Sequence, residues 1–170
     1  MKSSISYPAE DIVLGILEIE NGREAEKQGE RELLKQMLGY DVVLNHNEDG
    51  KPLIEGYNIS ISHTKGFVVI LLSKGLEVGI DIEYHSDRIQ KIARRFLRPD
   101  EIYTTTSDLL IAWCAKEAAY KLFSEEHLTY REMKVNVSKD QLINLKTTVT
   151  INFVPLIHSE YVIVMCWANK

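Results

Sequence analysis

The segment Val78–Glu83 alternates between branched apolar residues and small or acidic ones, and it constrains the fold more than any other segment of the 170-residue chain. Successive side chains of a β-strand point to opposite faces, so the three branched residues are expected to face a core together. Gly79, Asp81 and Glu83 then share the other face, with the carboxylates about 7 Å apart. A hard divalent cation would relieve their repulsion, although exposed strand faces often carry acids without binding a metal.

A helix expected over about residues 108–123 supplies a third carboxylate. Trp113, Glu117 and Lys121 recur every four residues and therefore lie on one side of that helix. One interpretation is a surface pair between Glu117 and Lys121, worth only about 0.3–0.5 kcal/mol. The other joins Glu117 to the two strand carboxylates around a divalent ion, with Lys116 and Lys121 reaching substrate phosphates.

The remaining pattern predicts an α+β chain of two similar halves, each a small antiparallel sheet packed with helices. Both parts of the chain show a strand, then a helix, then further strands, and the expected division is 1–78 and 79–170. Strands are expected over 13–19, 57–62, 67–72, 133–137, 148–154 and 161–167, and helices over 24–38 and from residue 86 onward.

Turn residues predict where several of these elements begin and end. Ser73–Gly75 is expected to turn one strand into the next as a hairpin. Gly29 weakens the first helix, whose start is therefore placed nearer Glu30. Pro99 is expected to open a further helix, and Pro155 to join the last two strands.

Composition excludes several classes of protein. With 45% hydrophobic and 26% charged residues the chain is an ordinary globular protein rather than a disordered one or a coiled coil. Its net charge of −5 disfavours nucleic acid as the main partner. No apolar run approaches the roughly 20 residues of a membrane helix. Cys114 and Cys166 form no disulfide framework, which favours a reducing cytoplasm.

Four motifs give the chain a family resemblance. Gly50–Pro52 and Asn58–Thr64 match the patterns G-K-P and N-x-S-x-S-H-[ST]. Gly79–Glu83 and Trp113–Lys121 match G-I-D-x-E and W-x-x-K-E-x-x-x-K. Because the four motifs occur in order, chance agreement is improbable, and the chain resembles the 4′-phosphopantetheinyl transferase superfamily.

The resemblance implies Mg²⁺-dependent transfer of 4′-phosphopantetheine from coenzyme A to a serine of an apo acyl or peptidyl carrier protein. Adenosine 3′,5′-bisphosphate is the other product, and the activity is of the holo-carrier-protein synthase type that serves fatty acid biosynthesis. Asp81, Glu83 and Glu117 would hold the Mg²⁺. The catalytic residues implied are Glu117, Lys121 and Asp81. Coenzyme A contacts are implied for Arg31, Lys51, Pro52, Ser62, His63, Lys116 and Lys121.

The resemblance also implies a monomer whose active site lies between the halves. Glu125–Met133, by its position after the long helix, is the expected docking edge for the carrier protein. The N-terminal half, expected to hold the coenzyme A phosphates and adenine, is shorter than in the pseudo-dimeric branch of the family. Two alternatives stay open. One is a catalytically degenerate member that only binds a carrier protein or coenzyme A, and the other is a metal-dependent nuclease.

Overall fold

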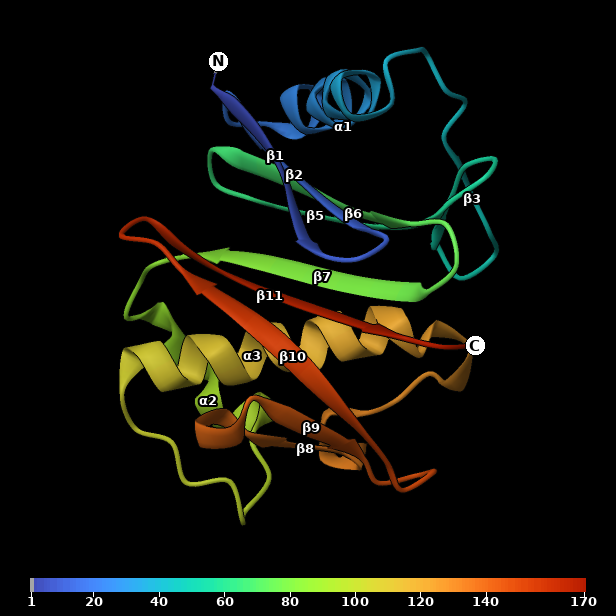
Figure 1. The fold of residues 1–170 in the computed structure, drawn as a ribbon. Coiled ribbons are helices and arrows are strands. Elements are labelled where there is room, and N and C mark those ends of the chain that lie inside the picture. Colours follow the sequence, from blue (N-terminus) through green and yellow to red (C-terminus); the bar gives the residue numbers. More distant parts are fainter. Residues whose placement is uncertain (1) are drawn as a thin grey trace.

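The computed structural model describes residues 2–170 as two antiparallel sheets packed face to face, with helices on their outer sides (Figure 1). Within these residues there are three α-helices and three sheets, one of the sheets being a short two-stranded pair. The first sheet has the order β1 (Ser3–Ala9), β2 (Ile12–Glu18), β6 (Phe67–Ser73) and β5 (Asn58–Thr64). Helix α1 (Arg23–Leu38) covers its outer face.

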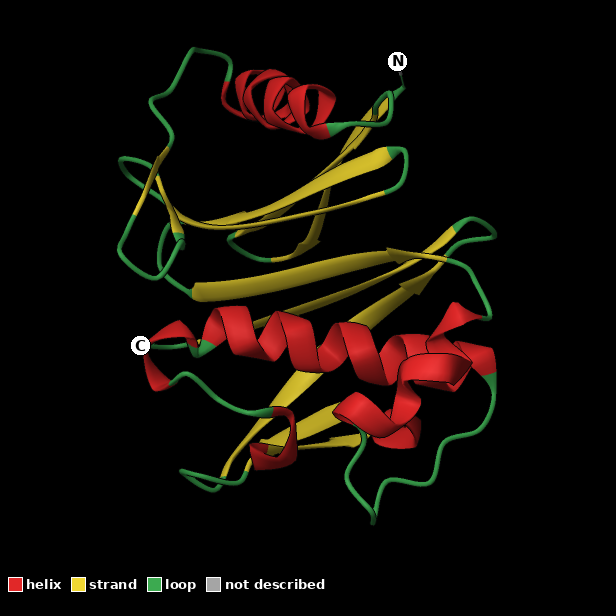
Figure 2. Cartoon of the chain, turned by 180° about the vertical axis from the view of Figure 1, so that it is seen from behind, coloured by secondary structure: helices red, strands yellow, loops and turns green. Residues whose placement is uncertain are grey.

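The second sheet carries the other two helices. Its order is β7 (Glu77–Tyr84), β11 (Tyr161–Ala168), β10 (Val149–Ile157), β9 (Gln141–Asn144) and β8 (Met133–Asn136). Figure 2 shows the long helix α3 (Thr106–Leu122) lying across this sheet, with α2 (Arg88–Phe96) beside it. The two-stranded pair is β3 (Asn45–His46) with β4 (Pro52–Leu53), in the loop between α1 and β5.

An apolar core between the two sheets joins them. Val78, Ile80 and Ile82 of β7 pack there against β2, β6 and β11, as their alternation predicted. Gly79 and the acidic face of β7 therefore point the other way, toward α3. The expected division at 78/79 falls within β7.

Strands β5 and β7 lie side by side where the two sheets meet, and serine and threonine hydroxyls link them. β7 pairs with β11 on one side only, so N–H groups of its other edge need separate acceptors. Backbone N–H groups of Ile80, Ile82 and Tyr84 donate to the hydroxyls of Ser60, Ser62 and Thr64, at 3.1, 3.2 and 3.2 Å. The motif Asn58–Thr64 thus fastens one sheet to the other.

Two expectations about the strands are wrong. Strand β1 precedes the segment taken as the first strand; its residues are mostly exposed, so no buried alternation marks it in the sequence. The turn at Ser73–Gly75 does not make a hairpin, because β6 and β7 belong to different sheets. The chain crosses there from the first sheet to the second.

The expected element boundaries also need three corrections. Helix α1 begins at Arg23 and runs through Gly29, where a Cβ atom would lie 2.8 Å from Ile19 Cγ2, so close packing requires the glycine. Pro99 opens no helix; α3 starts later, where the Thr105 hydroxyl accepts from a backbone N–H of the first turn. Pro155 lies inside β10, beyond the stretch that pairs with β9, where a missing N–H costs little.

Candidate active site

Gly79 brings strand β7 and helix α3 into backbone contact. A Cβ atom built on Gly79 would overlap the carbonyl oxygen of Ala118 and lie 3.0 Å from its carbonyl carbon. Only glycine therefore allows α3 to lie this close to β7. Asp81, two residues along the strand, consequently faces Lys121 on the next turn of the helix.

Asp81 and Lys121 form an ion pair at the junction of the two sheets. Lys121 Nζ lies 3.3 Å from Asp81 Oδ1 and donates to the backbone carbonyls of Ile61 at 3.2 Å and Ile80 at 2.9 Å. Ser62 Oγ donates to the same carboxylate oxygen at 2.9 Å. Asp81 is 7% exposed, so these donors replace most of its contact with water.

Each of the three predicted metal ligands accepts a hydrogen bond from a hydroxyl group. Besides the serine at Asp81, Thr64 Oγ1 donates to Glu83 Oε1 at 3.1 Å, and the Tyr130 hydroxyl donates to Glu117 Oε1 at 2.7 Å. Within residues 2–170, no N–H or O–H group donates to the second oxygen of any of the three carboxylates. One oxygen of Glu83 and one of Glu117 therefore remain for another partner, whereas Asp81 also contacts the Cys114 thiol.

Burial raises the pKa of two of these carboxylates. It raises the pKa of Asp81 although Lys121 and Ser62 act in the opposite direction. It also raises the pKa of Glu117, which the Tyr130 hydroxyl lowers and the charge of Asp81 raises further. Burial and Glu117 both raise the pKa of Tyr130. The phenol therefore stays protonated and donates a hydrogen bond to the Glu117 carboxylate. A bound cation would favour the charged form of both acids.

The expected convergence of three carboxylates on one point is absent from this conformation. Within residues 2–170 no three His, Cys, Asp or Glu side chains come close enough together to hold a metal ion. The donor chemistry nevertheless fits a hard cation, because carboxylate oxygens are what Mg²⁺ prefers and each acid keeps one oxygen without an N–H or O–H donor. Holding one ion would require the three acids to come closer together than they lie here.

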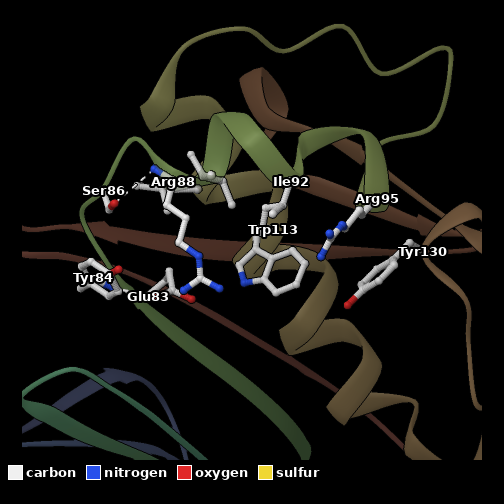
Figure 3. A pocket seen from close by; sticks show the side chains of 10 residues that line it. Glu83, Tyr84, Ser86, Arg88, Ile92, Arg95, Trp113 and Tyr130 are labelled. Atoms are coloured by element: carbon white, nitrogen blue, oxygen red, sulfur yellow. Dashed lines mark hydrogen bonds between the residues drawn. The ribbon is translucent and has the colours of Figure 1, made fainter. Parts of the chain in front are cut away.

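A hollow of about 320 Å³ opens beside these groups (Figure 3). Trp113 of α3 and Tyr130 form one part of its wall, and Glu83 lies at the end of β7. Arg88 and Arg95 extend into it from α2, and Figure 3 shows the Arg88 side chain reaching toward Glu83. The hollow thus combines an apolar wall with two cations next to the acidic strand, a combination suited to an anionic ligand with an apolar part.

Lys116 does not reach a substrate phosphate, contrary to expectation. Its side chain is fully buried, and Nζ donates to Glu101 Oε1 at 2.5 Å and to the carbonyls of Phe96 at 2.7 Å and Tyr130 at 3.1 Å. A buried ammonium group with three acceptors has no access to a ligand. Because the neighbouring Glu117 faces the site, the two adjacent residues of the helix motif have separate roles.

The other predicted coenzyme A contacts lie mainly in the first half of the chain. Lys51 pairs with Glu77 at 3.1 Å, and Pro52 lies in β4 beside it. His63 Nδ1 lies 3.3 Å from a carboxylate of the first turn of α1, and Arg31 is exposed on the same helix. The structure gathers Ser62, but not these residues, around Asp81.

The sequence did not predict that two further residues contact the carboxylates. Thr64 was detectable, because it follows Ser60 and Ser62 at a spacing of two and therefore shares their face of β5. Tyr130 gave no signal, since it lies in a short 3-10 turn, Tyr130–Glu132, that the chain pattern does not predict. Only the tertiary structure brings it to Glu117.

Residues 77–166 match the family model of the 4′-phosphopantetheinyl transferase superfamily, and this stretch includes β7, α3 and all three carboxylates. No match was found among curated proteins. Within residues 2–170, no helix is both long enough and apolar enough to cross a membrane.

Proposed function

The chain belongs to the 4′-phosphopantetheinyl transferase superfamily, and we propose that it transfers 4′-phosphopantetheine from coenzyme A to a serine of an apo acyl or peptidyl carrier protein. Family membership supports phosphopantetheinyl transfer in general. The observation that supports the specific proposal is the buried Asp81–Lys121 pair at the β7–α3 contact. Glu83, two residues along β7 from Asp81, lines a hollow that offers both cations and apolar surface.

The reaction needs positioning and charge more than covalent chemistry. The serine oxygen forms a bond to the phosphorus that bears the pantetheine, the bond from that phosphorus to adenosine 3′,5′-bisphosphate breaks, and the serine proton leaves. Negative charge spreads over the transferred and departing phosphates, so a fixed cation stabilises the transition state. Lys121, held by two carbonyls and Asp81, is that cation in our proposal. Glu117, directly or through water, accepts the serine proton.

Asp81, Glu83 and Glu117 would hold Mg²⁺, as their carboxylate chemistry permits. When bound, the ion neutralises charge on the diphosphate of coenzyme A. The protein contributes the hydroxyl donors that hold one oxygen of each carboxylate. The buried surroundings of Asp81 also limit its contact with water.

The proposed contacts of coenzyme A and of the carrier protein lie in different segments of the chain. Lys51, Pro52, Ser62, His63 and Arg31 remain the proposed coenzyme A contacts, and Lys116 is omitted because it is buried. The carrier protein is proposed to dock along Glu125–Met133, next to the basic helix α2, which has no acid in its first turn. We further propose a monomer that acts in the cytoplasm, where two buried thiols stay reduced.

A transfer assay tests the proposal. The purified protein, Mg²⁺, coenzyme A and a panel of apo carrier proteins are incubated, and intact-mass spectrometry is expected to show one phosphopantetheine adduct. Carriers from fatty-acid, polyketide and peptide synthetases together establish the substrate type. No adduct on any of them, with coenzyme A still bound by the protein, would identify a degenerate member instead.

Two variants connect the activity to the proposed residues. Glu117→Gln and Asp81→Ala are each expected to slow transfer at least about 100-fold, because each removes a charge from the reacting centre. Circular dichroism checks that both variants stay folded. Unchanged transfer in both would exclude these carboxylates from the active site, and Mg²⁺-dependent plasmid cleavage by the wild type would favour a nuclease.

A further inference from the structure

Tyr130 contacts a proposed metal ligand through its hydroxyl group. Its phenol donates to Glu117 Oε1 at 2.7 Å, and among residues 2–170 this is the only hydrogen bond that its hydroxyl makes. The hydroxyls of Ser62 and Thr64, by contrast, also accept backbone N–H groups of β7 and so hold the two sheets together. Tyr130 is therefore the one donor of the three whose hydroxyl acts on its carboxylate alone.

The position of Tyr130 is fixed from several sides, independently of Glu117. Its backbone carbonyl accepts from the buried Nζ of Lys116 at 3.1 Å, and its ring lies 5.6 Å from that of Trp113, centroid to centroid. Arg98 Nη1 donates to the carbonyl of the next residue, Arg131. A side chain anchored in this way orients its partner rather than following it.

The buried ion pair of Lys116 explains how this anchoring is built. Glu101 Oε1 accepts from Lys116 Nζ, while Glu101 Oε2 accepts from the backbone N–H of Val135 at 2.7 Å. The pair thus links α3, the loop before it and β8, with the Tyr130 turn between them. Lys116 reaches the site only through Tyr130.

We propose that Tyr130 is a positioning residue that holds one oxygen of Glu117 and so presents the other to a divalent cation. This inference rests on the proposed function for the identity of the site, but it concerns the binding of the ion and not the transfer. Outer hydrogen-bond partners of metal ligands typically affect metal affinity or activity about 10- to 100-fold. Tyr130 accordingly sets the concentration of Mg²⁺ that the enzyme needs.

The test compares Tyr130→Phe with Tyr103→Phe. Tyr103 lies in the same half of the chain. Its hydroxyl donates to the carbonyl of Val135 and accepts from the N–H of Val137. The control therefore also loses a phenol oxygen, but one that does not contact the carboxylates. Mn²⁺ binding to each protein in the presence of coenzyme A is measured by electron paramagnetic resonance. We expect Tyr130→Phe to bind Mn²⁺ about tenfold more weakly and Tyr103→Phe to bind it as the wild type does.

The transfer assay gives a second measurement. In Tyr130→Phe the Mg²⁺ concentration for half-maximal transfer is expected to rise about tenfold, while the rate at saturating Mg²⁺ stays near that of the wild type. Tyr130→Phe keeps the ring that packs on Trp113 and removes only the hydroxyl, so its loss reports on the hydrogen bond to Glu117. An unchanged Mg²⁺ requirement in Tyr130→Phe would overturn the inference.

The remaining outcomes separate this inference from the proposed function. Unchanged or tighter Mn²⁺ binding by Tyr130→Phe would overturn the positioning role, and so would a wild type that binds no Mn²⁺. If the wild type binds Mn²⁺, Tyr130→Phe binds it more weakly and no carrier protein is modified, the positioning role stands and the transferase proposal fails.

Discussion

A long helix packs against each of the two sheets at a glycine of the sheet. The two contacts differ in which atom of the helix lies next to that glycine. In the first half, a Cβ atom on Gly15 of β2 would overlap the sulfur of Met37, the end of a flexible side chain of α1. In the second half, a Cβ atom on Gly79 would overlap the backbone oxygen of Ala118 in α3. The first contact can adjust and the second cannot, and only the second carries the carboxylates and the lysine of the proposed site.

The ion pairs on these two helices show the same contrast. Lys35 of α1 pairs with Asp41 at 3.5 Å in solvent, with side chains 55% and 86% exposed. Lys116 of α3 pairs with Glu101 in the interior, at 0% and 1%. Burial lowers the pKa of Lys116, and the contact with Glu101 acts in the opposite direction. The half with the proposed site therefore contains a buried ion pair, whereas the pair on α1 lies at the surface.

Removing one partner from each ion pair is expected to give the largest difference between the halves. Lys116→Met leaves Glu101 buried without its cation and should lower the free energy of unfolding by about 3–5 kcal/mol. Asp41→Asn, in the exposed pair, should change it by about 0–1 kcal/mol. Urea denaturation of both variants measures the difference. Similar small losses in both would show that the interior pair is no more important than the surface pair.

Adding one methyl group at each glycine is expected to have the next largest effect. Gly79→Ala forces α3 away from β7 and should cost about 2–3 kcal/mol, because a backbone atom cannot move aside alone. Gly15→Ala should cost about 1 kcal/mol or less, since the Met37 side chain can change its rotamer. Denaturation midpoints of the two variants compare the sites.

Transfer activity gives this comparison a second measure. Gly79→Ala also separates Asp81 from Lys121, so transfer should fall even at temperatures where the variant is folded. Gly15→Ala lies outside the site and should leave transfer near the wild-type rate. Full activity in folded Gly79→Ala would contradict the view that the close backbone contact assembles the site.

Local chemistry predicted those parts of the fold that a repeating pattern marks. The alternation in Val78–Glu83 predicted both the strand and the face that its branched residues bury. The long helix with Glu117 and Lys121 was likewise visible from its spacing, whereas the exposed strand β1 has no buried face to produce a pattern. Local chemistry also could not assign β6 and β7 to different sheets. The same short turn sequence can join two strands of one sheet or two strands of different sheets.

The sequence pattern placed Asp81 and Lys121 on two elements that contact each other, but it did not identify the groups that contact Lys116 and Glu117. Asp81, placed by the strand pattern, does meet Lys121 of the helix. The burial of Lys116 depends on Glu101, which lies in a loop without a motif, so a lysine next to Glu117 suggested a ligand contact instead. Tyr130 reaches Glu117 only because that buried pair fixes the turn that carries it.

The smallest expected effect is a difference in how two aspartates respond to pH. Burial raises the pKa of Asp81 from the ordinary 3.8, so the folded chain binds its proton more tightly than the unfolded chain. The free energy of unfolding therefore falls as pH rises through the raised value. Asp81→Asn lacks this titration, so in EDTA its stability relative to the wild type should rise as pH increases from 3.8 to the raised value and stay constant above it.

Asp11, in the turn between β1 and β2, should show the opposite sign. The backbone N–H of Lys74, the hydroxyl of Ser73 and the N–H of Gly75 lower its pKa from 3.8, so its stabilisation is present above that pH and disappears as pH falls through the lowered value. Asp11→Asn should thus be less stable than the wild type at neutral pH, with a difference that vanishes on acidification. Thermal midpoints measured from pH 7 down to pH 3 compare the two. Differences of the same sign for both variants would contradict the distinction between a buried acid that opposes folding and an exposed one that supports it.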